Sequence, residues 1–182
     1  MKLTGKRICF LVEEGFEDLE FWAVHMRLEE EGAHITIAAP KAGATFRSKS
    51  GGLTATAAAA VADLHAAHFD AVVVPGGWAP DKLRRYEAVK SLVADAYVQG
   101  KIVGMICHAG WVGASARIVR SHRCTGSIAI RDDMENAGAE WVDLPAFRDR
   151  NLVWGRVVAD IPAFNRELVR AIAENSSPTV SA

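Results

Sequence analysis

Segments that resemble buried strands alternate with segments of helical periodicity along most of this chain. Continuous apolar runs at Arg7–Val12, Phe69–Pro75 and Ile102–Ile106 are typical of parallel strands covered on both faces. Apolar residues recur at helical spacing in Glu17–Glu31 and Tyr86–Gln99, and each of these segments is followed by a glycine. The alternation predicts an α/β fold: a three-layer sandwich with a mostly parallel sheet and helices on both faces.

The other predicted elements are shorter, and the 182 residues, 50% of them hydrophobic, are expected to form one domain over residues 1–182. Strands are expected at His34–Pro40 and Asn151–Val158, an edge or hairpin strand at Leu53–Thr56, helices at Asp132–Ala137 and Pro162–Glu174, a helical turn at Asp63–His68, a loop at Lys41–Gly52 and a frayed polar tail from Ser176 onward.

Composition excludes several classes of function. The net charge is −1 and charged residues are spread along the chain, so no basic surface for nucleic acid is expected. No apolar stretch approaches the ~20 residues that cross a bilayer, and Met1–Arg7 does not resemble a signal peptide, so we expect a cytoplasmic protein without membrane contact. The three cysteines fit neither a disulfide framework nor a zinc motif, which favours a reducing compartment.

Metal and nucleotide cofactors are not expected. His65 and His68 have a spacing that could suit a metal, but no third ligand is apparent. The glycine pairs Gly51-Gly52 and Gly76-Gly77 do not form a dinucleotide-binding or phosphate-binding loop.

Cys107 is the main candidate for chemistry. It follows the apolar run Ile102–Ile106 and precedes a segment of small residues that can begin a helix. Such a turn lifts a side chain out of the sheet, and the N–H groups of a following helix favour thiolate over thiol. The carboxyl ends of two other predicted strands, at Glu13–Glu17 and Pro75–Asp81, are expected to meet Cys107-His108 at one crevice.

Four blocks of sequence carry a resemblance to a known family. They are EGFEDLE at Glu14–Glu20, VPGGWAPD at Val74–Asp81, ICH at Ile106–His108 and IRDDMENAGAEWVD at Ile130–Asp143. In this order they resemble PfpI/ThiJ proteins of the class I glutamine-amidotransferase-like superfamily. The resemblance implies a single domain of that type, a flavodoxin-like sheet with a nucleophile elbow, no cofactor, and a homodimer or hexamer.

The resemblance also implies roles for individual residues. Cys107 is expected to be the nucleophile, and Glu17 the acid beside its sulfur, although Glu17 could simply be an acid favoured by the helix dipole. His108 is expected to be the base, held by Asp81 from a neighbouring subunit. Asp81 is shorter than the glutamate of many relatives, and it could be no more than a helix cap.

Five further residues are expected to line the site. Backbone N–H groups of Gly76 and Gly77, with that of His108, are placed to stabilise an oxyanion. Ala109 is small enough for the elbow, although many relatives have glycine there. Trp78 and Trp111 are expected to wall the substrate pocket or to serve in packing.

The family includes several activities, so more than one function stays open. The first hypothesis is a cofactor-free cysteine enzyme acting on reactive carbonyls or their adducts, as glyoxalases and deglycases do. The same residues would serve a cysteine peptidase or amidohydrolase, so an amide or peptide is the alternative substrate. A redox-sensing stress protein or chaperone, whose thiolate is oxidised without turnover, is the hypothesis from another class.

Overall fold

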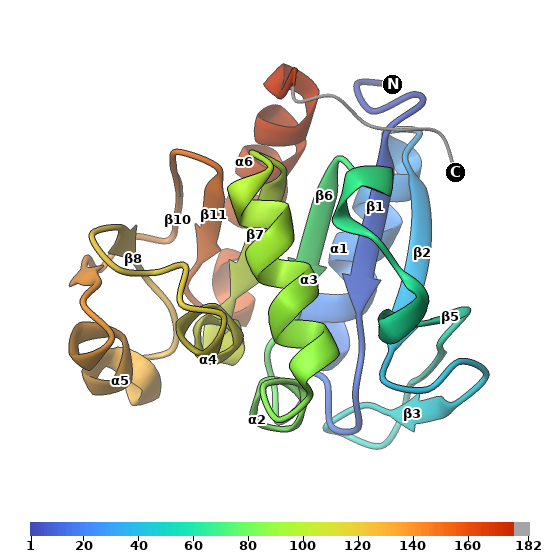
Figure 1. Cartoon of the computed structure of the whole chain (residues 1–182), viewed down its shortest axis with the longest axis horizontal. Helices are drawn as coiled ribbons and strands as arrows, with labels where there is room; N and C mark the ends of the chain where they lie inside the picture. Colours follow the sequence, from blue (N-terminus) through green and yellow to red (C-terminus); the bar gives the residue numbers. More distant parts are fainter. Residues whose placement is uncertain (177–182) are drawn as a thin grey trace.

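A seven-stranded sheet forms the centre of the computed structural model, which describes residues 1–176 (Figure 1). Its strand order is β10-β11-β7-β6-β1-β2-β5, and every pairing is parallel except that of β10 with β11. The strands are β1 (Arg7–Leu11), β2 (His34–Ala39), β5 (Ala59–Ala60), β6 (Ala71–Val74), β7 (Ile102–Ile106), β10 (Ala146–Asp149) and β11 (Leu152–Gly155).

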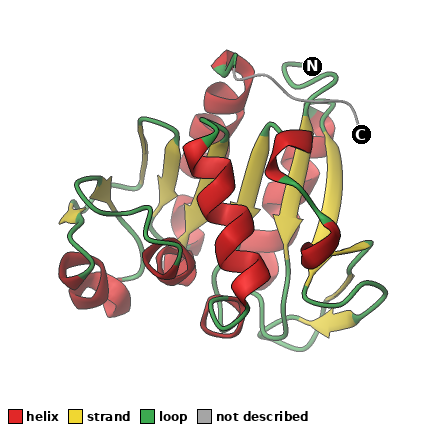
Figure 2. Ribbon diagram, viewed as in Figure 1, coloured by secondary structure: helices red, strands yellow, loops and turns green. Residues whose placement is uncertain are grey.

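Helices cover both faces of this sheet, so the predicted three-layer α/β sandwich is confirmed. In Figures 1 and 2, α3 lies over one face, and α1 and α6 lie over the other. The helices are α1 (Asp18–Glu30), α2 (Ala79–Leu83), α3 (Glu87–Val98), α4 (Gly110–Ser115), α5 (Arg131–Asn136) and α6 (Ile161–Glu174), and short 3-10 turns include η1 (Val61–Asp63), η2 (Ala66–His68) and η3 (Cys107–Ala109).

The sheet interior explains why the central strands are apolar throughout. Every residue of β6 and β7 is buried, as are the last four residues of β1. Strands covered on both faces gain from apolar side chains on each side, at about 25 cal/mol for every Å² removed from water. Because β1, β6 and β7 are parallel neighbours, their carboxyl ends lie together, near α2 and α4 (Figure 1).

Several short strands were not expected from the sequence. The predicted loop at Lys41–Gly52 contains β3 (Thr45–Arg47), which forms a hairpin with the expected strand β4 (Thr54–Thr56). A second small sheet pairs β8 (Arg123–Cys124) with β9 (Glu140–Trp141), and of these two strands only β9 was not expected. The predicted frayed tail from Ser176 onward lies almost entirely outside the described residues. No helix in residues 1–176 is long and apolar enough to span a membrane.

Candidate active site

Cys107 occupies a strained turn between β7 and α4. Its φ angle is 61°, in the left-handed region that non-glycine residues rarely adopt. The turn η3 begins at Cys107, and α4 follows directly at Gly110. Such a backbone costs about 1–2 kcal/mol and persists only where the surrounding structure imposes it. The predicted nucleophile elbow is therefore present.

Glu17 does not lie where the family resemblance suggested. Its carboxylate caps α1, accepting the backbone N–H groups of Leu19 and Glu20 at 2.9 and 2.8 Å. This is the position that a helix dipole favours for an acid. The expectation that Glu17 is the acid beside the sulfur is wrong, and its physical reason is that the cap orients this carboxylate toward the helix start.

Glu20, one turn further along α1, supplies that acid. Its side chain is fully buried, and its Oε2 accepts the backbone N–H of Gly76 at 2.9 Å. A Cβ on Gly76 would lie 2.3 Å from that Oε2 and 2.7 Å from Cβ of Cys107. Only a glycine fits between the two side chains, and the thiol of Cys107 hydrogen-bonds with the Glu20 carboxyl.

The acid and the thiol perturb each other's ionisation. Burial, followed by the charge of Glu17, raises the pKa of Glu20 from 4.5 to about 7. Burial also raises the pKa of the Cys107 thiol, and the charge of Glu20 adds to this effect. A thiolate and a carboxylate in hydrogen-bond contact in a buried site repel each other, so the pair of Cys107 and Glu20 keeps at least one proton at neutral pH.

The expected stabilisation of a thiolate by the following helix is therefore outweighed. The backbone N–H groups of His108 and Gly77 do lower the pKa of Cys107, but burial raises it more. The helix α4 has only six residues and therefore a small dipole. The sulfur therefore ionises only when it reacts, or when the Glu20 carboxylate takes up a proton and loses its charge.

His108 is close enough to accept the thiol proton. Its Nδ1 lies 3.2 Å from Sγ of Cys107. Burial, and then the positive charge of Lys49, lower the pKa of the imidazole below its usual 6.5. The ring is neutral at pH 7, as a base must be. Its centre lies 5.3 Å from the Trp111 ring in an edge-on contact.

Trp111 is fixed by three contacts of its own. Its indole Nε1 donates to Asp133 Oδ2 at 2.7 Å, and the guanidinium carbon of Arg84 lies 5.7 Å from the ring centre. Together with the edge-on contact to His108, these interactions hold Trp111 beside the imidazole. Its predicted role in lining a substrate pocket stays a prediction.

Two substitutions should raise the pKa of His108 through separate causes. Trp111→Ala removes a ring that shields the imidazole from water, and Lys49→Met removes the positive charge that disfavours its protonation. The measurement is the NMR titration of the His108 ring. Lys41→Met, an exposed charge change on another loop, is the matched control. A His108 titration unchanged in both variants would contradict the assigned causes.

The backbone N–H groups of Gly76 and Gly77 have different partners. The N–H of Gly77 points to the sulfur, as does that of His108, so these two donors are available near a developing oxyanion. The N–H of Gly76 is used by Glu20 instead, so its predicted oxyanion role is wrong. Gly77 has φ +77°, and a Cβ there would lie 2.4 Å from the Gly15 carbonyl oxygen, so no other residue fits.

The remaining predicted residues lie outside this cluster. Ala109 is fully buried in the core, so it shapes the elbow without facing a substrate. Trp78 is exposed and covers Gly15, with the Lys49 ammonium 5.9 Å from its ring centre. Asp81 forms an ion pair with Arg85, four residues further along the same chain. A contact between Asp81 and His108 of a second copy stays a prediction.

Two functional residues were missed by the sequence reasoning. Glu20 shares a helical stripe with Val24 and Leu28, both buried, so an acid on an apolar face was the signal that could have found it. Lys49 carries no local signal, since it lies in a loop and acts on His108 only through the fold.

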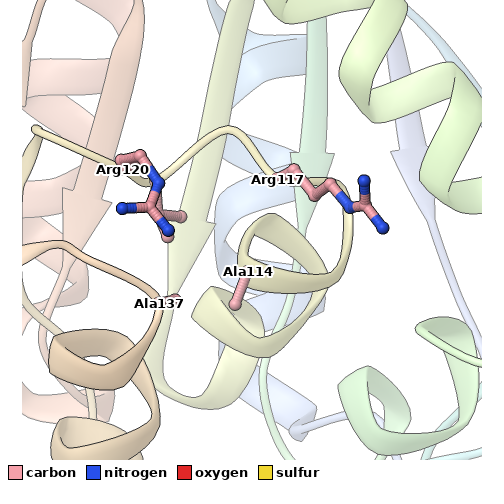
Figure 3. A pocket seen from close by; sticks show the side chains of 5 residues that line it. Ala114, Arg117, Arg120 and Ala137 are labelled. Atoms are coloured by element: carbon pink, nitrogen blue, oxygen red, sulfur yellow. The ribbon is translucent and has the colours of Figure 1, made fainter.

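The described residues show no ready metal site. No group of three or more His, Cys, Asp or Glu side chains within residues 1–176 is arranged to hold a metal ion. A cavity of about 420 Å³ lies beyond the C-terminal end of α4, away from Cys107, between Arg117 and Arg120 (Figure 3). These two arginines extend in different directions, so they do not converge on one ligand.

Comparisons with known proteins identify the family of this chain. Residues 6–171 match the model of the DJ-1/PfpI family. Deglycase PH1704 of Pyrococcus horikoshii is 37% identical over 166 residues, which cover 91% of this chain and 99% of that protein. Protein/nucleic acid deglycase 2 of Escherichia coli is 34% identical over 169 residues, covering 92% and 98%.

A solved structure extends the likeness to three dimensions. A two-domain protein of Anabaena variabilis, with DJ-1/ThiJ/PfpI-like and ferritin-like domains, superposes with a TM-score of 0.91 and 32% identity. The match covers 96% of this chain and 50% of that one. On its sequence and its fold, the chain belongs to the DJ-1/PfpI family.

Proposed function

We propose that this protein is a cofactor-free, cysteine-dependent enzyme that acts on reactive carbonyls or their adducts. The observation that carries the proposal is the placement of one sulfur between a buried acid and a neutral imidazole. Cys107 hydrogen-bonds with Glu20 and lies 3.2 Å from Nδ1 of His108. Such a cluster can bring a nucleophile to a carbonyl and move protons around it.

The first step is the addition of the sulfur to an aldehyde. With methylglyoxal, the S–C bond forms at the aldehyde carbon while the thiol proton passes to Nδ1 of His108. The oxygen of the former carbonyl becomes an alkoxide, which the N–H groups of Gly77 and His108 stabilise before it takes up a proton from Glu20. The product of this step is a hemithioacetal.

Two further steps release a hydroxy acid. The Glu20 carboxylate, which gave up its proton in the first step, takes a proton from the aldehyde carbon and returns it to the neighbouring ketone carbon. The proton of the new hydroxyl passes to the former ketone oxygen, so the hemithioacetal becomes a thioester of lactate. Water then attacks the thioester carbonyl and gives a proton to Glu20, the S–C bond breaks, and the leaving sulfur takes the proton held by His108, which restores the thiol as lactic acid leaves. The sum is methylglyoxal plus water giving lactic acid, so no external oxidant or reductant is required.

Adducts of the same aldehyde fit the same site. The relatives reported above are named deglycases, and a hemithioacetal or aminocarbinol differs from free methylglyoxal only in the group attached to the aldehyde carbon. Departure of that group as a thiol or amine returns the aldehyde to the cysteine. The proposal places the enzyme in the reducing cytoplasm, and Asp81 of a second copy of the chain at His108 in a homo-oligomer.

A substrate panel tests the proposal. The wild-type protein should form lactate from methylglyoxal and free the amine of a methylglyoxal–lysine adduct, and prior treatment with iodoacetamide should abolish both. One thiol per chain should be alkylated, because Cys9 and Cys124 are fully buried. Hydrolysis of amides or peptides without lactate formation would favour the peptidase. Oxidation of Cys107 by peroxide without any turnover would favour the redox sensor.

A further inference from the structure

A cavity of about 380 Å³ lies beside the segment that hydrogen-bonds the backbone of Cys107. The N–H of Ser127 donates to the carbonyl oxygen of Cys107 at 3.1 Å, and both Ser127 and its neighbour Gly126 line the cavity. Val157, which follows β11, also lines the cavity. Because Gly155 of β11 pairs with Ile106 of β7, the chain after β11 runs beside the elbow.

Three apolar side chains form much of the wall of this cavity, which we name the Ile128 pocket. Ile128 is 71% exposed, an unusual state for an isoleucine beside a concave surface. Trp141 and Val157 are half-buried and line the same space. An apolar group that entered the pocket would cover side chains that are otherwise in water.

The charged residues at the rim are already paired. Arg156 donates to Asp143 at 2.7 Å and to Asp160 at 2.9 Å, and Arg131 donates to Glu135 at 2.9 Å. Each guanidinium thus has its own carboxylate. The rim therefore offers no unpaired cation to a phosphate or carboxylate, and the pocket fits a neutral apolar group better than an anion.

We propose that the Ile128 pocket is a substrate subsite that takes an apolar or aromatic group attached near the reacting carbonyl. This proposal rests on the proposed function for its chemistry. It specifies the substrate class as carbonyl adducts on peptides in which an apolar residue neighbours the adduct, in preference to free methylglyoxal. Ile128 and Trp141 are then specificity-determining residues.

Alkylation of Cys107 tests the subsite without requiring turnover. In this reaction the sulfur forms a bond to the probe carbon, iodide leaves, and the thiol proton passes to the buffer. N-benzyl-iodoacetamide carries an aromatic group that iodoacetamide lacks. The ratio of their rate constants, measured by intact-protein mass spectrometry, should be about fivefold or more above the ratio for glutathione.

Substitutions in the pocket should lower that ratio. Ile128→Ser and Trp141→Leu should each reduce it by about threefold or more, since each removes apolar surface from the wall. Ile128 is exposed, so its substitution does not threaten folding. Val98→Ser, which changes an 80% exposed valine on α3, is the matched control and should keep the wild-type ratio.

The outcomes separate this proposal from the proposed function. A wild-type ratio equal to that of glutathione, or a ratio unchanged in both pocket variants, would overturn the subsite even if the enzyme forms lactate. A ratio that falls in both variants supports the subsite even if no carbonyl substrate is turned over. If the enzyme is active, kcat/KM for an adduct on a phenylalanine-containing peptide should fall in the two pocket variants by about the same factor as the ratio of alkylation rate constants.

Discussion

Replacing Cys107 with alanine should lower lactate production from methylglyoxal by about a thousandfold or more. The substitution removes the atom that bonds to the aldehyde carbon, and no other thiol can replace it, since Cys9 and Cys124 are fully buried in the core. The left-handed backbone at position 107 is equally strained for alanine, so the fold should persist. Lactate is measured enzymatically, and folding by thermal denaturation.

Two matched variants control for the loss of a cysteine as such. Cys9→Ala and Cys124→Ala each remove a buried thiol that lies outside the cluster around Cys107. Each should keep activity within a few-fold of the wild-type protein, although the small cavity that it leaves lowers stability by about 1 kcal/mol. Turnover by Cys107→Ala close to the wild-type rate would remove this sulfur from the mechanism.

The fold could be predicted from the sequence to the extent that burial alone determines it. The run at Ile102–Ile106 is apolar because β7 is covered on both faces, and such a pattern can be read directly. The edge strand β10, by contrast, has the sequence AFRD, with no residue fully buried. Its strand conformation comes from pairing with β11, which is a tertiary contact and leaves no local periodicity.

The candidate site could be predicted only in part. Cys107 and His108 are neighbours in the sequence, so a single turn brings them together and a local pattern suffices. The acid comes from a different element, and Glu17 and Glu20 differ by one helical turn. Which of the two meets the sulfur depends on how α1 rotates against the sheet. The ionisation of the thiol depends on burial, which the sequence around Cys107 does not show.

Substitution of the two acids by glutamine should separate their roles. Glu20→Gln should lower kcat/KM about a hundredfold, because the amide has no acidic proton to give to the alkoxide and cannot take one from the substrate. It can still accept the N–H of Gly76, so the local geometry should persist. Glu17→Gln, the matched control on the same helix, should cost about 1 kcal/mol of stability through the weaker cap and leave most of the activity. A larger loss of activity in Glu17→Gln than in Glu20→Gln would contradict the assignment.

The Glu20→Gln variant should also show that the buried acid lowers stability at neutral pH. Burial raises the pKa of Glu20 from 4.5 to about 7, so the folded protein retains a proton that the unfolded chain releases between these values. The stability that this proton provides is complete below about pH 4.5 and is lost as the pH rises through 7, a change on the order of 3 kcal/mol.

Glu20→Gln has no such charge to bury, so urea denaturation should find it more stable than the wild-type protein at pH 8, and by a smaller margin at pH 5. An equal margin at both pH values would mean that Glu20 does not titrate in this range. A variant that is more stable but much less active is the result expected if this chain retains a costly buried carboxyl for its chemistry.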